Sequence, residues 1–187
     1  MRIAVSGTHG VGKSTLIDDF LRRHPEFAHE PEPYTVMVED FGDEFSAKPC
    51  VEDFMRQLEF NIERLHTAGE SVIFERCPVD FLAYIHALDP QSAEALVEPI
   101  TEAMKQLDLI VYIPLDATSS ENEFPKLQRA VDRRLRSIFR EDKFGIMSST
   151  NAKVVEATGP TDQRLSTLET AILVNIKHAV IRNLQKS

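Results

Sequence analysis

A stretch near the start of the chain, SGTHGVGKST, limits the possible folds more than any other part of the sequence. Gly7, Gly12, Lys13 and Ser14 within it fit the spacing G-x-x-x-x-G-K-[ST]. An apolar run before the stretch predicts a buried strand, and apolar residues at helical spacing after it predict a helix. Glycines between a strand and a helix let backbone N–H groups surround phosphate oxygens. The stretch is therefore expected to be a phosphate-binding loop.

The residue types in this loop predict what it binds. The lysine of such a loop reaches the β and γ phosphates of a nucleoside triphosphate, and the hydroxyl that follows it binds Mg²⁺. ATP and Mg²⁺ are thus the expected cofactors, with Lys13 and Ser14 in these two roles. His9 is interpreted as a spacer within the loop. The predicted nucleotide-binding residues of the loop are Gly7, Thr8, His9, Gly10, Val11, Gly12, Lys13, Ser14 and Thr15.

Length and composition favour a single domain over residues 1–187. Apolar residues make up 42% of the chain, and no apolar run reaches the roughly 18 residues that a membrane span requires. The first residues lack the long apolar core of a secretory signal. Cys50 and Cys77 form neither a CxxC motif nor a pattern with histidine that would bind zinc. We expect a cytoplasmic protein without a membrane partner.

The formal net charge of −9 argues against a broad nucleic-acid surface, because binding to a phosphate backbone depends on clustered Lys and Arg. The positive charge is unevenly spread, since it is concentrated in residues 126–143, KLQRAVDRRLRSIFREDK. Composition alone leaves two interpretations of this basic segment open. It is either a solvated helix face or a cationic cluster that contacts phosphate.

Short apolar runs alternate with longer segments of helical periodicity, which is typical of a parallel sheet covered by helices. The predicted strands lie at residues 2–5, 26–30, 71–74, 109–113 and 153–158, and the prolines after residue 30 are expected to end the second of them. The predicted helices lie at residues 13–24, 51–68, 79–88, 92–107 and 161–184, with a further one in the basic segment. No repeat, low-complexity tract or linker divides the chain, so an α/β fold in one domain is expected.

The chain resembles the small P-loop kinases of nucleosides and nucleotides. The segments that carry the resemblance are GTHGVGKST, FERCPVDFLAY at residues 74–84, LDLIVYIPLD at residues 107–116 and the basic segment. The likeness is greatest to the AAA_28 or NadR-kinase-like group. It implies a three-layer P-loop NTPase fold with five parallel strands in the order 2-3-1-4-5, and a helical lid inserted at about residues 119–148.

The resemblance assigns roles to residues at the carboxyl ends of the predicted strands, where α/β proteins bind ligands. Glu75 is implied as the carboxylate that binds Mg²⁺, and Arg76 as an electrostatic clamp on the transferring phosphoryl group. Asp116, which follows the strand on the other side of the loop, is the competing Mg²⁺ carboxylate. Asp80 belongs either to this edge of the sheet or to the N-terminus of a helix, as a partner of the helix dipole.

The resemblance also implies residues on the acceptor side. Nucleoside kinases place a glutamate before a proline after the second strand, where it accepts a proton from the attacking hydroxyl. Glu30 and Glu32 both precede prolines, and Glu30 is preferred because it lies closer to the predicted strand end. Gln57 and Arg64 are seven residues apart, hence on one helix face, and are the implied contacts of the acceptor base.

The basic segment acquires a role through the same resemblance. Arg129, Arg133, Arg136 and Arg140 follow one another at steps of four, three and four residues, which places them on one helical stripe. Kinases of this type carry arginines on a lid over the triphosphate, where guanidinium groups bind phosphate oxygens bidentately. Arg134 is a further candidate, so the choice among these arginines stays open. Candidates for contact with adenine follow the last strand and are Thr158, Gly159 and Pro160.

The expected activity is ATP- and Mg²⁺-dependent transfer of phosphate to a small-molecule acceptor, with nucleosides and nucleotides as the first candidates. ATP and this acceptor are then the expected partners, and a homodimer is left open. The alternative function is a nucleotide-sensing ATPase module that switches a protein partner without a metabolite acceptor. Phosphorylation of nucleic-acid 5′ ends is disfavoured by the net negative charge.

Overall fold

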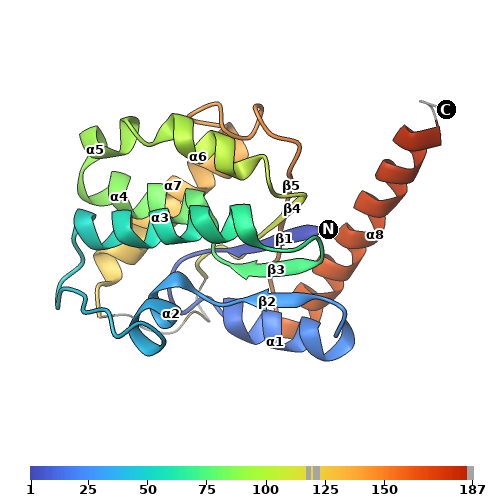
Figure 1. Cartoon of the computed structure of the whole chain (residues 1–187), viewed down its shortest axis with the longest axis horizontal. Coiled ribbons are helices and arrows are strands. Elements are labelled where there is room, and N and C mark those ends of the chain that lie inside the picture. The colour runs from blue at the N-terminus through green and yellow to red at the C-terminus, as the bar shows by residue number, and fades with distance from the viewer. Residues whose placement is uncertain (117–118, 120–122, 185–187) are drawn as a thin grey trace.

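A computed structural model describes residues 1–116, 119 and 123–184, with side chains up to residue 177. Within this part of the chain, five parallel strands form one sheet in the predicted order, β2-β3-β1-β4-β5. The strands are β1 (Arg2–Ser6), β2 (Ala28–Glu30), β3 (Val72–Glu75), β4 (Leu109–Tyr112) and β5 (Lys153–Glu156). Val5 of β1 is in register with Glu75 of β3 and Val111 of β4, so these strands end at one edge of the sheet (Figure 1).

Helices cover both faces of this sheet (Figure 1). In the described residues they are α1 (Lys13–Arg23), α2 (Pro33–Glu39), α3 (Val51–Thr67), α4 (Pro78–Leu88), α5 (Pro90–Glu94), α6 (Val97–Met104), α7 (Pro125–Glu141) and α8 (Thr161–Leu184). Helices α1 and α8 pack on one face, and α3, α4, α6 and α7 pack on the other. The predicted three-layer arrangement is confirmed.

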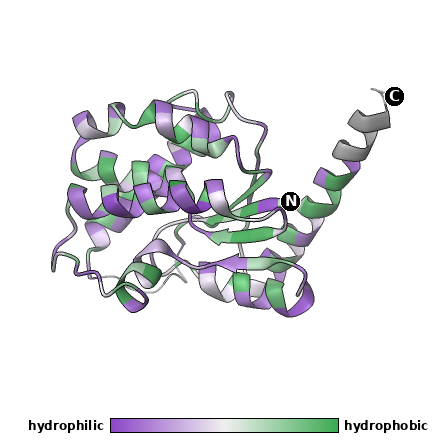
Figure 2. Cartoon of the chain, in the orientation of Figure 1, coloured by the Kyte–Doolittle hydropathy of each residue, from purple (hydrophilic) through white to green (hydrophobic). Residues whose placement is uncertain are grey.

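Alternation of side chains along the strands builds a core on each side of the sheet. Ile3 and Val5 of β1 pack with Leu168 of α8, whereas Ala4 belongs to the opposite core with Leu135 of α7. All five residues are fully buried. In Figure 2 the central strands β1 and β3 are mainly hydrophobic, whereas the surrounding helices mix hydrophobic and hydrophilic residues.

Between β3 and β4 the sequence left one or two helices open, and the segment at residues 92–107 falls on two short helices, α5 and α6, that follow α4. Pro99 lies in the first turn of α6, where its missing N–H needs no partner. Inside a continuous helix the same proline would remove the hydrogen bond to residue 95 and clash with the carbonyl there. The chain therefore turns at residues 95 and 96 before α6 begins.

Helix α2 has no counterpart among the predicted elements. Its first residue is Pro33, whose fixed φ suits the N1 position of a helix. The prolines that end β2 thus also start a helix, which their interpretation as strand breakers missed. Helix α2 packs against α3 and brings Tyr34 and Thr35 to the wall of a pocket described below.

Helix α7 occupies most of the predicted lid and is packed against α4. Val131, Leu135 and Ile138 on its inner face are buried in the core that it shares with α4. Residues 120–122 of the predicted lid lie outside the described residues. The structure places α7 in the helical layer, and closure of a lid stays a prediction.

Helix α8 begins against α1, and its C-terminal part extends past the body of the molecule (Figure 1). Leu173, Val174 and Ile176 on this extension are exposed. In the part of the chain that the structure describes, no helix is both long enough and apolar enough to cross a bilayer.

Candidate functional site

The loop between β1 and α1 is shaped by its glycines. Gly7 has a φ of 147° and Gly12 a φ of 92°, values that residues with side chains rarely adopt. A Cβ on Gly7 would also lie 2.6 Å from the carbonyl oxygen of Ile113 and 2.9 Å from Cγ2 of Val11. Helix α1 begins at Lys13, so its first N–H groups have no partner within the helix and face the loop. The loop therefore has backbone donors and space for phosphate oxygens.

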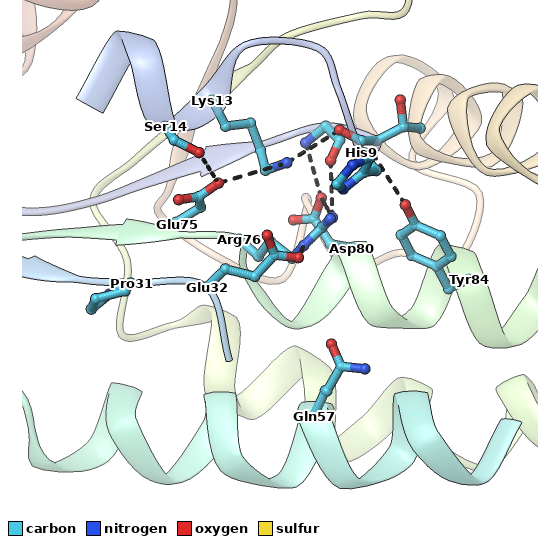
Figure 3. A network of polar contacts seen from close by, with 12 residues as sticks. His9, Lys13, Ser14, Pro31, Glu32, Gln57, Glu75, Arg76, Asp80 and Tyr84 are labelled. Atoms are coloured by element: carbon cyan, nitrogen blue, oxygen red, sulfur yellow. Dashed lines mark hydrogen bonds and ion pairs between the residues drawn. The ribbon is translucent and has the colours of Figure 1, made fainter. Parts of the chain in front are cut away.

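The Lys13 side chain is buried in this loop. Its Nζ donates to the carbonyl oxygen of Thr8 at 3.1 Å and lies 3.9 Å from Oε1 of Glu75 (Figure 3). Burial lowers the pKa of Lys13, as does the charge of Arg76, while Glu32 and Glu75 act in the opposite direction. The ammonium group is held by one carbonyl and one carboxylate beside the space that phosphate would occupy.

Ser14 and Glu75 meet across the ends of α1 and β3, where Ser14 Oγ donates to Glu75 Oε1 at 2.9 Å. Hydroxyl and carboxylate oxygens are ligands that Mg²⁺ prefers, and this ion usually takes few protein ligands and completes its shell with phosphates and water. The donor set fits Mg²⁺ bound together with a triphosphate. Among the described residues, no group of three or more His, Cys, Asp or Glu could hold a metal by itself. Asp116, the competing candidate, forms an ion pair with Arg164 instead.

Arg76 follows β3 with a φ of 76°, in the left-handed region that is uncommon for a residue with a side chain. Its N–H donates to the carbonyl oxygen of Val5 at 3.0 Å. Its guanidinium Nε donates to Glu32 Oε1 at 2.5 Å, and Nη1 donates to the carbonyl oxygen of Gly7 at 3.0 Å. This backbone turn aims a buried cation at the phosphate-binding loop.

Arg76 and Glu32 form an ion pair in which both groups stay charged. Burial opposes the charge of each group, but their mutual attraction outweighs this effect. The pKa of Glu32 falls to about 2, because the charges of Arg76 and then Lys13 overcome burial, and the pKa of Arg76 is raised. Glu32 is therefore an anion throughout the neutral pH range.

Asp80 in the first turn of α4 contacts the loop and also caps its own helix. The residue is fully buried. Its Oδ1 accepts from the N–H of Gly7 at 2.9 Å, and its Oδ2 accepts from the N–H of Cys77 at 3.0 Å. Both interpretations of Asp80 from the sequence thus describe part of its position. The N–H of Gly7 is held by Asp80 while its carbonyl oxygen is held by Arg76.

A pocket of about 720 Å³ opens beside the loop. Glu32 and Arg76 form part of its wall, and Gln57 faces them from α3 (Figure 3). The rings of Phe54 and Tyr84, which also line the pocket, are stacked with centroids 4.5 Å apart and an interplanar angle of 19°. Other lining residues that bear on its chemistry are His9, Phe45, Asp53, Phe81, Glu123, Phe124 and Gln128.

His9 joins the phosphate-binding loop to this pocket. Its N–H donates to Tyr84 Oη at 3.2 Å, and its carbonyl oxygen accepts from Gln128 Nε2 at 2.6 Å. Tyr84 comes from α4 and Gln128 from α7, so one loop residue contacts two helices of the pocket wall. The residue that the sequence suggested as a spacer holds the loop, the pocket and α7 together through its backbone.

The structure separates the two glutamates that the sequence left open. Glu32 lines the pocket, whereas the preferred candidate, Glu30, forms an ion pair with Arg64. Arg64 also donates to the carbonyl oxygen of Pro31 at 2.7 Å and does not line the pocket, unlike its predicted companion Gln57. Of these residues the structure places Glu32 and Gln57 at the pocket, so our preference moves from Glu30 to Glu32, and the roles of all four residues stay predictions. The reason is that the chain leaves the sheet after Glu30 and turns into α2, which directs Glu32 toward the pocket.

Two of the four arginines on the predicted lid stripe tie α7 to the end of the sheet. Arg136 Nε donates to Asp132 Oδ2 at 2.7 Å, and Arg136 Nη2 donates to the carbonyl oxygen of Leu115 at 3.1 Å. Arg140 binds both carboxylate oxygens of Glu156 at 2.5 and 2.7 Å. In this structure both side chains have protein partners in place of the phosphate contacts that the sequence suggested.

The other two arginines of the stripe, Arg129 and Arg133, are exposed on α7. Arg134 points to α4, where its Nε donates to His86 Nδ1 at 2.9 Å. The stripe thus has two parts with different surroundings. Arg129 and Arg133 remain the arginines of α7 that we predict to contact phosphate.

Sequence reasoning missed Arg164 of α8, whose buried side chain contacts the phosphate-binding loop. Its Nη1 donates to the carbonyl oxygen of Val11 at 2.6 Å, and its Nη2 donates to Asp116 Oδ2 at 3.1 Å. Helical periodicity contains no signal for such a contact, since an arginine in an amphipathic helix is ordinarily a surface residue. The loop before α8 carries the predicted adenine contacts, which are all exposed: Thr158, Gly159 and Pro160.

Comparison with known proteins agrees with the fold. Similar solved structures include NadR protein in complex with NR, which is 17% identical with a TM-score of 0.60 over 84% of this chain and 45% of that chain. Thymidylate kinase from Candida albicans is 14% identical, with a TM-score of 0.67 over 95% of this chain and 92% of that chain. Deoxyadenosine kinase from M. mycoides is 15% identical, with a TM-score of 0.64 over 93% and 100% of the two chains.

These likenesses show the fold of P-loop nucleoside and nucleotide kinases. The chain spans less than half of the length of the NadR protein. No curated protein sequence matches it. Residues 2–164 match the family AAA_28, described as an AAA domain. With its phosphate-binding loop, the strand order β2-β3-β1-β4-β5 and this match over most of its length, the chain belongs to the AAA_28 family.

Proposed function

We propose that the protein is an ATP- and Mg²⁺-dependent phosphotransferase that acts on a small acceptor of the nucleoside or nucleotide type. The position of the pocket carries this proposal. His9, Glu32 and Arg76 belong both to the pocket wall and to the surroundings of the phosphate-binding loop. A molecule in the pocket would lie next to the terminal phosphate of a nucleotide in the loop. A module that only senses nucleotides needs no second small-molecule pocket at this place.

On the donor side, the loop N–H groups and Lys13 would bind the phosphates of ATP, aided by the N-terminus of α1. Ser14 and Glu75 would hold Mg²⁺, which when bound neutralises charge on the β and γ phosphates. The hydroxyl of Thr8 is buried and has no hydrogen-bond partner among the described residues. Buried polar groups are ordinarily paired, and a bound phosphate would supply the missing partner.

Glu32 is proposed to accept a hydrogen bond, and then the proton, from the attacking hydroxyl of the acceptor. Its pKa of about 2 makes it a weak base while it is paired with Arg76. As an anion it can still accept a hydrogen bond from the hydroxyl and orient the attacking oxygen. Phosphoryl transfer through a loose transition state demands little of a base. Movement of Arg76 toward the phosphoryl group would raise the pKa of Glu32 and make it a better proton acceptor.

Arg76 is proposed to stabilise the transferring phosphoryl group. Its guanidinium lies in surroundings with little water, where its attraction for developing negative charge is stronger than in bulk solvent. Its contact with the carbonyl oxygen of Gly7 places it at the start of the phosphate-binding loop. Arg129 and Arg133 would add positive charge from α7 if the predicted lid closes, and closure would also exclude water.

Acceptor-dependent formation of ADP tests the proposal. We expect a nucleoside or nucleotide to accelerate ADP release from Mg·ATP, in a panel that also contains sugars and cofactor precursors. Lys13→Ala should lower this rate on the order of 10³-fold, because it removes the charge at the β and γ phosphates. Lys105→Ala, at an exposed lysine on the surface, is the control and should retain the rate. Hydrolysis that no acceptor accelerates and that a protein partner stimulates would support the switch function instead.

A further inference from the structure

We infer that the acceptor is an unphosphorylated molecule with a planar ring, neutral or positively charged, and not a nucleotide or another anion. This inference rests on the proposed function and narrows it, since nucleosides and nucleotides both satisfy the site described above. The charges on the pocket wall carry the argument, together with the aromatic rings beside them.

The charged residues on the pocket wall are mostly acidic. Glu32, Asp53 and Glu123 line the pocket, and Arg76 is the one Arg or Lys among its described lining residues. Arg76 has 4% of its surface exposed and donates to Glu32 and to the carbonyl oxygen of Gly7. In the described wall, the positive charge of Arg76 is thus already paired with the carboxylate of Glu32.

His9 adds no lasting positive charge to this wall. Partial burial lowers its pKa below the ordinary value of 6.5; the charge of Glu32 acts in the opposite direction, and the charges of Arg76 and Lys13 lower the pKa further. Its imidazole is therefore mainly neutral at physiological pH. A phosphate on the acceptor would find no protonated histidine there.

The arginines of α3 nearest to the pocket already have carboxylate partners. Arg64 forms an ion pair with Glu30 and lies away from the pocket wall. Arg56 forms an ion pair with Asp43 at 2.9 Å and donates to the carbonyl oxygen of Glu44 at 3.1 Å. Its Nη1 also lies 3.9 Å from Oδ1 of Asp53, a longer contact that compensates only part of the charge of this lining residue. Neither arginine lines the pocket, so helix α3 presents Asp53 and amide groups to it instead of cations.

An acceptor phosphate would find little compensating charge in the described wall. Glu123, between β4 and α7, adds an exposed acid to it. A phosphate monoester carries a charge of about −1.5 to −2 at neutral pH, and proteins that bind one supply Arg, Lys or helix N-termini. An acceptor phosphate here would face carboxylates without such compensation. A neutral or cationic acceptor avoids this repulsion.

The walls of the pocket suit a flat ring. Phe54 is stacked on Tyr84, and Phe45, Phe81 and Phe124 also line the space. Aromatic side chains of this kind pack against planar rings, and their faces attract positive charge. Gln57 and Asp53 lie on the same wall and offer an amide and a carboxylate to ring nitrogens or exocyclic amines. A volume of about 720 Å³ is sufficient for a nucleoside.

Matched pairs of acceptors test the inference. Adenosine, guanosine, cytidine and thymidine, and one nucleoside with a cationic pyridinium ring, are each compared with their 5′-monophosphates. The measurements are kcat/KM from ADP release at saturating Mg·ATP, and acceptor affinity by calorimetry with ADP bound. We expect the best unphosphorylated acceptor to exceed its monophosphate by roughly 100-fold or more in kcat/KM, because two added negative charges face the acidic wall.

A variant pair tests whether the acidic wall causes this selectivity. Asp53→Asn removes one negative charge while its oxygen can still accept from the N–H of Ser46, as Asp53 does at 2.8 Å. It should lower the preference for the unphosphorylated acceptor roughly tenfold. Glu59→Gln, at an exposed acid of α3 outside the pocket, is the matched control and should leave the preference unchanged.

The outcomes separate the inference from the proposed function. Faster ADP release with a monophosphate than with its nucleoside would overturn the inference and leave a kinase. If no acceptor accelerates ADP release, the proposed function fails, and calorimetry then decides the inference alone. Binding of the nucleosides in preference to their monophosphates would support it, whereas preferred binding of monophosphates, or of neither, would overturn it.

Discussion

Two parts of the candidate site are built in different ways: the proposed donor half around the phosphate-binding loop, and the proposed acceptor half formed by the pocket. The donor half comes from two short segments, residues 7–14 and 75–80, which contact each other through backbone groups and buried charges. The acceptor half takes its walls from α2, α3, α4 and α7 and from the chain between α2 and α3. Backbone geometry and buried charges therefore shape the donor half, while side chains from several helices shape the pocket.

The largest expected effect is at the backbone of the donor half. Gly7→Ala places a Cβ 2.6 Å from the carbonyl oxygen of Ile113. We expect a loss of ATP affinity of at least about 100-fold and a decrease of about 2–4 kcal/mol in the free energy of unfolding. ATP titration and urea denaturation measure the two effects. Gly42→Ala is the matched control, because its φ of 71° is also positive but its surroundings are open. Equal losses in both variants would remove the steric explanation.

Glu75→Gln tests the charge of the carboxylate that contacts Ser14 and Lys13 in the donor half. The amide keeps the shape of the side chain and loses the charge that would hold Mg²⁺ beside Ser14. We expect kcat to fall on the order of 10²-fold, with a much smaller change in the dissociation constant of ATP. Steady-state kinetics and nucleotide titration separate the two quantities, with Glu98→Gln on the exposed face of α6 as control. Normal turnover in Glu75→Gln would remove the assignment.

Glu32 joins the two halves, and its ionisation predicts a pH dependence of stability. Its pKa is lowered from 4.5 to about 2, so the pair with Arg76 stabilises the fold fully above about pH 4.5 and loses this contribution as pH falls toward 2. Glu32→Gln should lower the free energy of unfolding by about 2–3 kcal/mol at pH 7, because the buried guanidinium of Arg76 loses its shortest carboxylate contact and keeps only Asp80, at 3.8 Å, as a charged partner. Urea denaturation between pH 7 and 3 should show this difference shrinking at the acidic end. A difference that is constant with pH would contradict the pairing.

The smallest predicted effect concerns Arg164 of α8, which contacts the phosphate-binding loop. Arg164→Lys keeps the charge, but a single ammonium group cannot reproduce both contacts of the guanidinium with Val11 and Asp116. The dissociation constant of ATP should rise roughly fivefold with kcat nearly unchanged. Arg22→Lys, at an exposed arginine of α1, is the control and should change neither quantity. A large fall in kcat would show that Arg164 takes part in the transfer itself.

The donor half could be predicted from the sequence because its parts are local. Gly7, Gly12, Lys13 and Ser14 lie within one short loop of the sequence. The apolar runs around this loop place it at the edge of a parallel sheet. Once the strand order was expected, the end of β3 had to lie beside the end of β1. The contact between Ser14 and Glu75 follows from that topology, while the catalytic role of Glu75 stays a prediction.

The acceptor half could be predicted only in part, because it depends on where loops turn. Glu30 and Glu32 look equivalent in sequence, yet the chain turns into α2 between them and sends one to Arg64 and the other to Arg76. Gln57 and Arg64 share a helix face, but about two turns of helix separate them. Of the two, Gln57 lines the pocket and Arg64 does not. Periodicity describes the face of a helix and carries no information on which part of that face meets a pocket.

The two backbone contacts of Gly7 restrict which substitutions this chain can accept. Both polar groups of the Gly7 backbone are engaged by the segment that starts α4, the N–H by Asp80 and the carbonyl oxygen by Arg76. A substitution at residue 76 or 80 therefore alters the phosphate-binding loop as directly as a substitution within the loop would. Among descendants of this sequence that keep nucleotide binding, the two segments should be inherited as one unit, whereas the aromatic residues of the pocket are free to diverge with the acceptor.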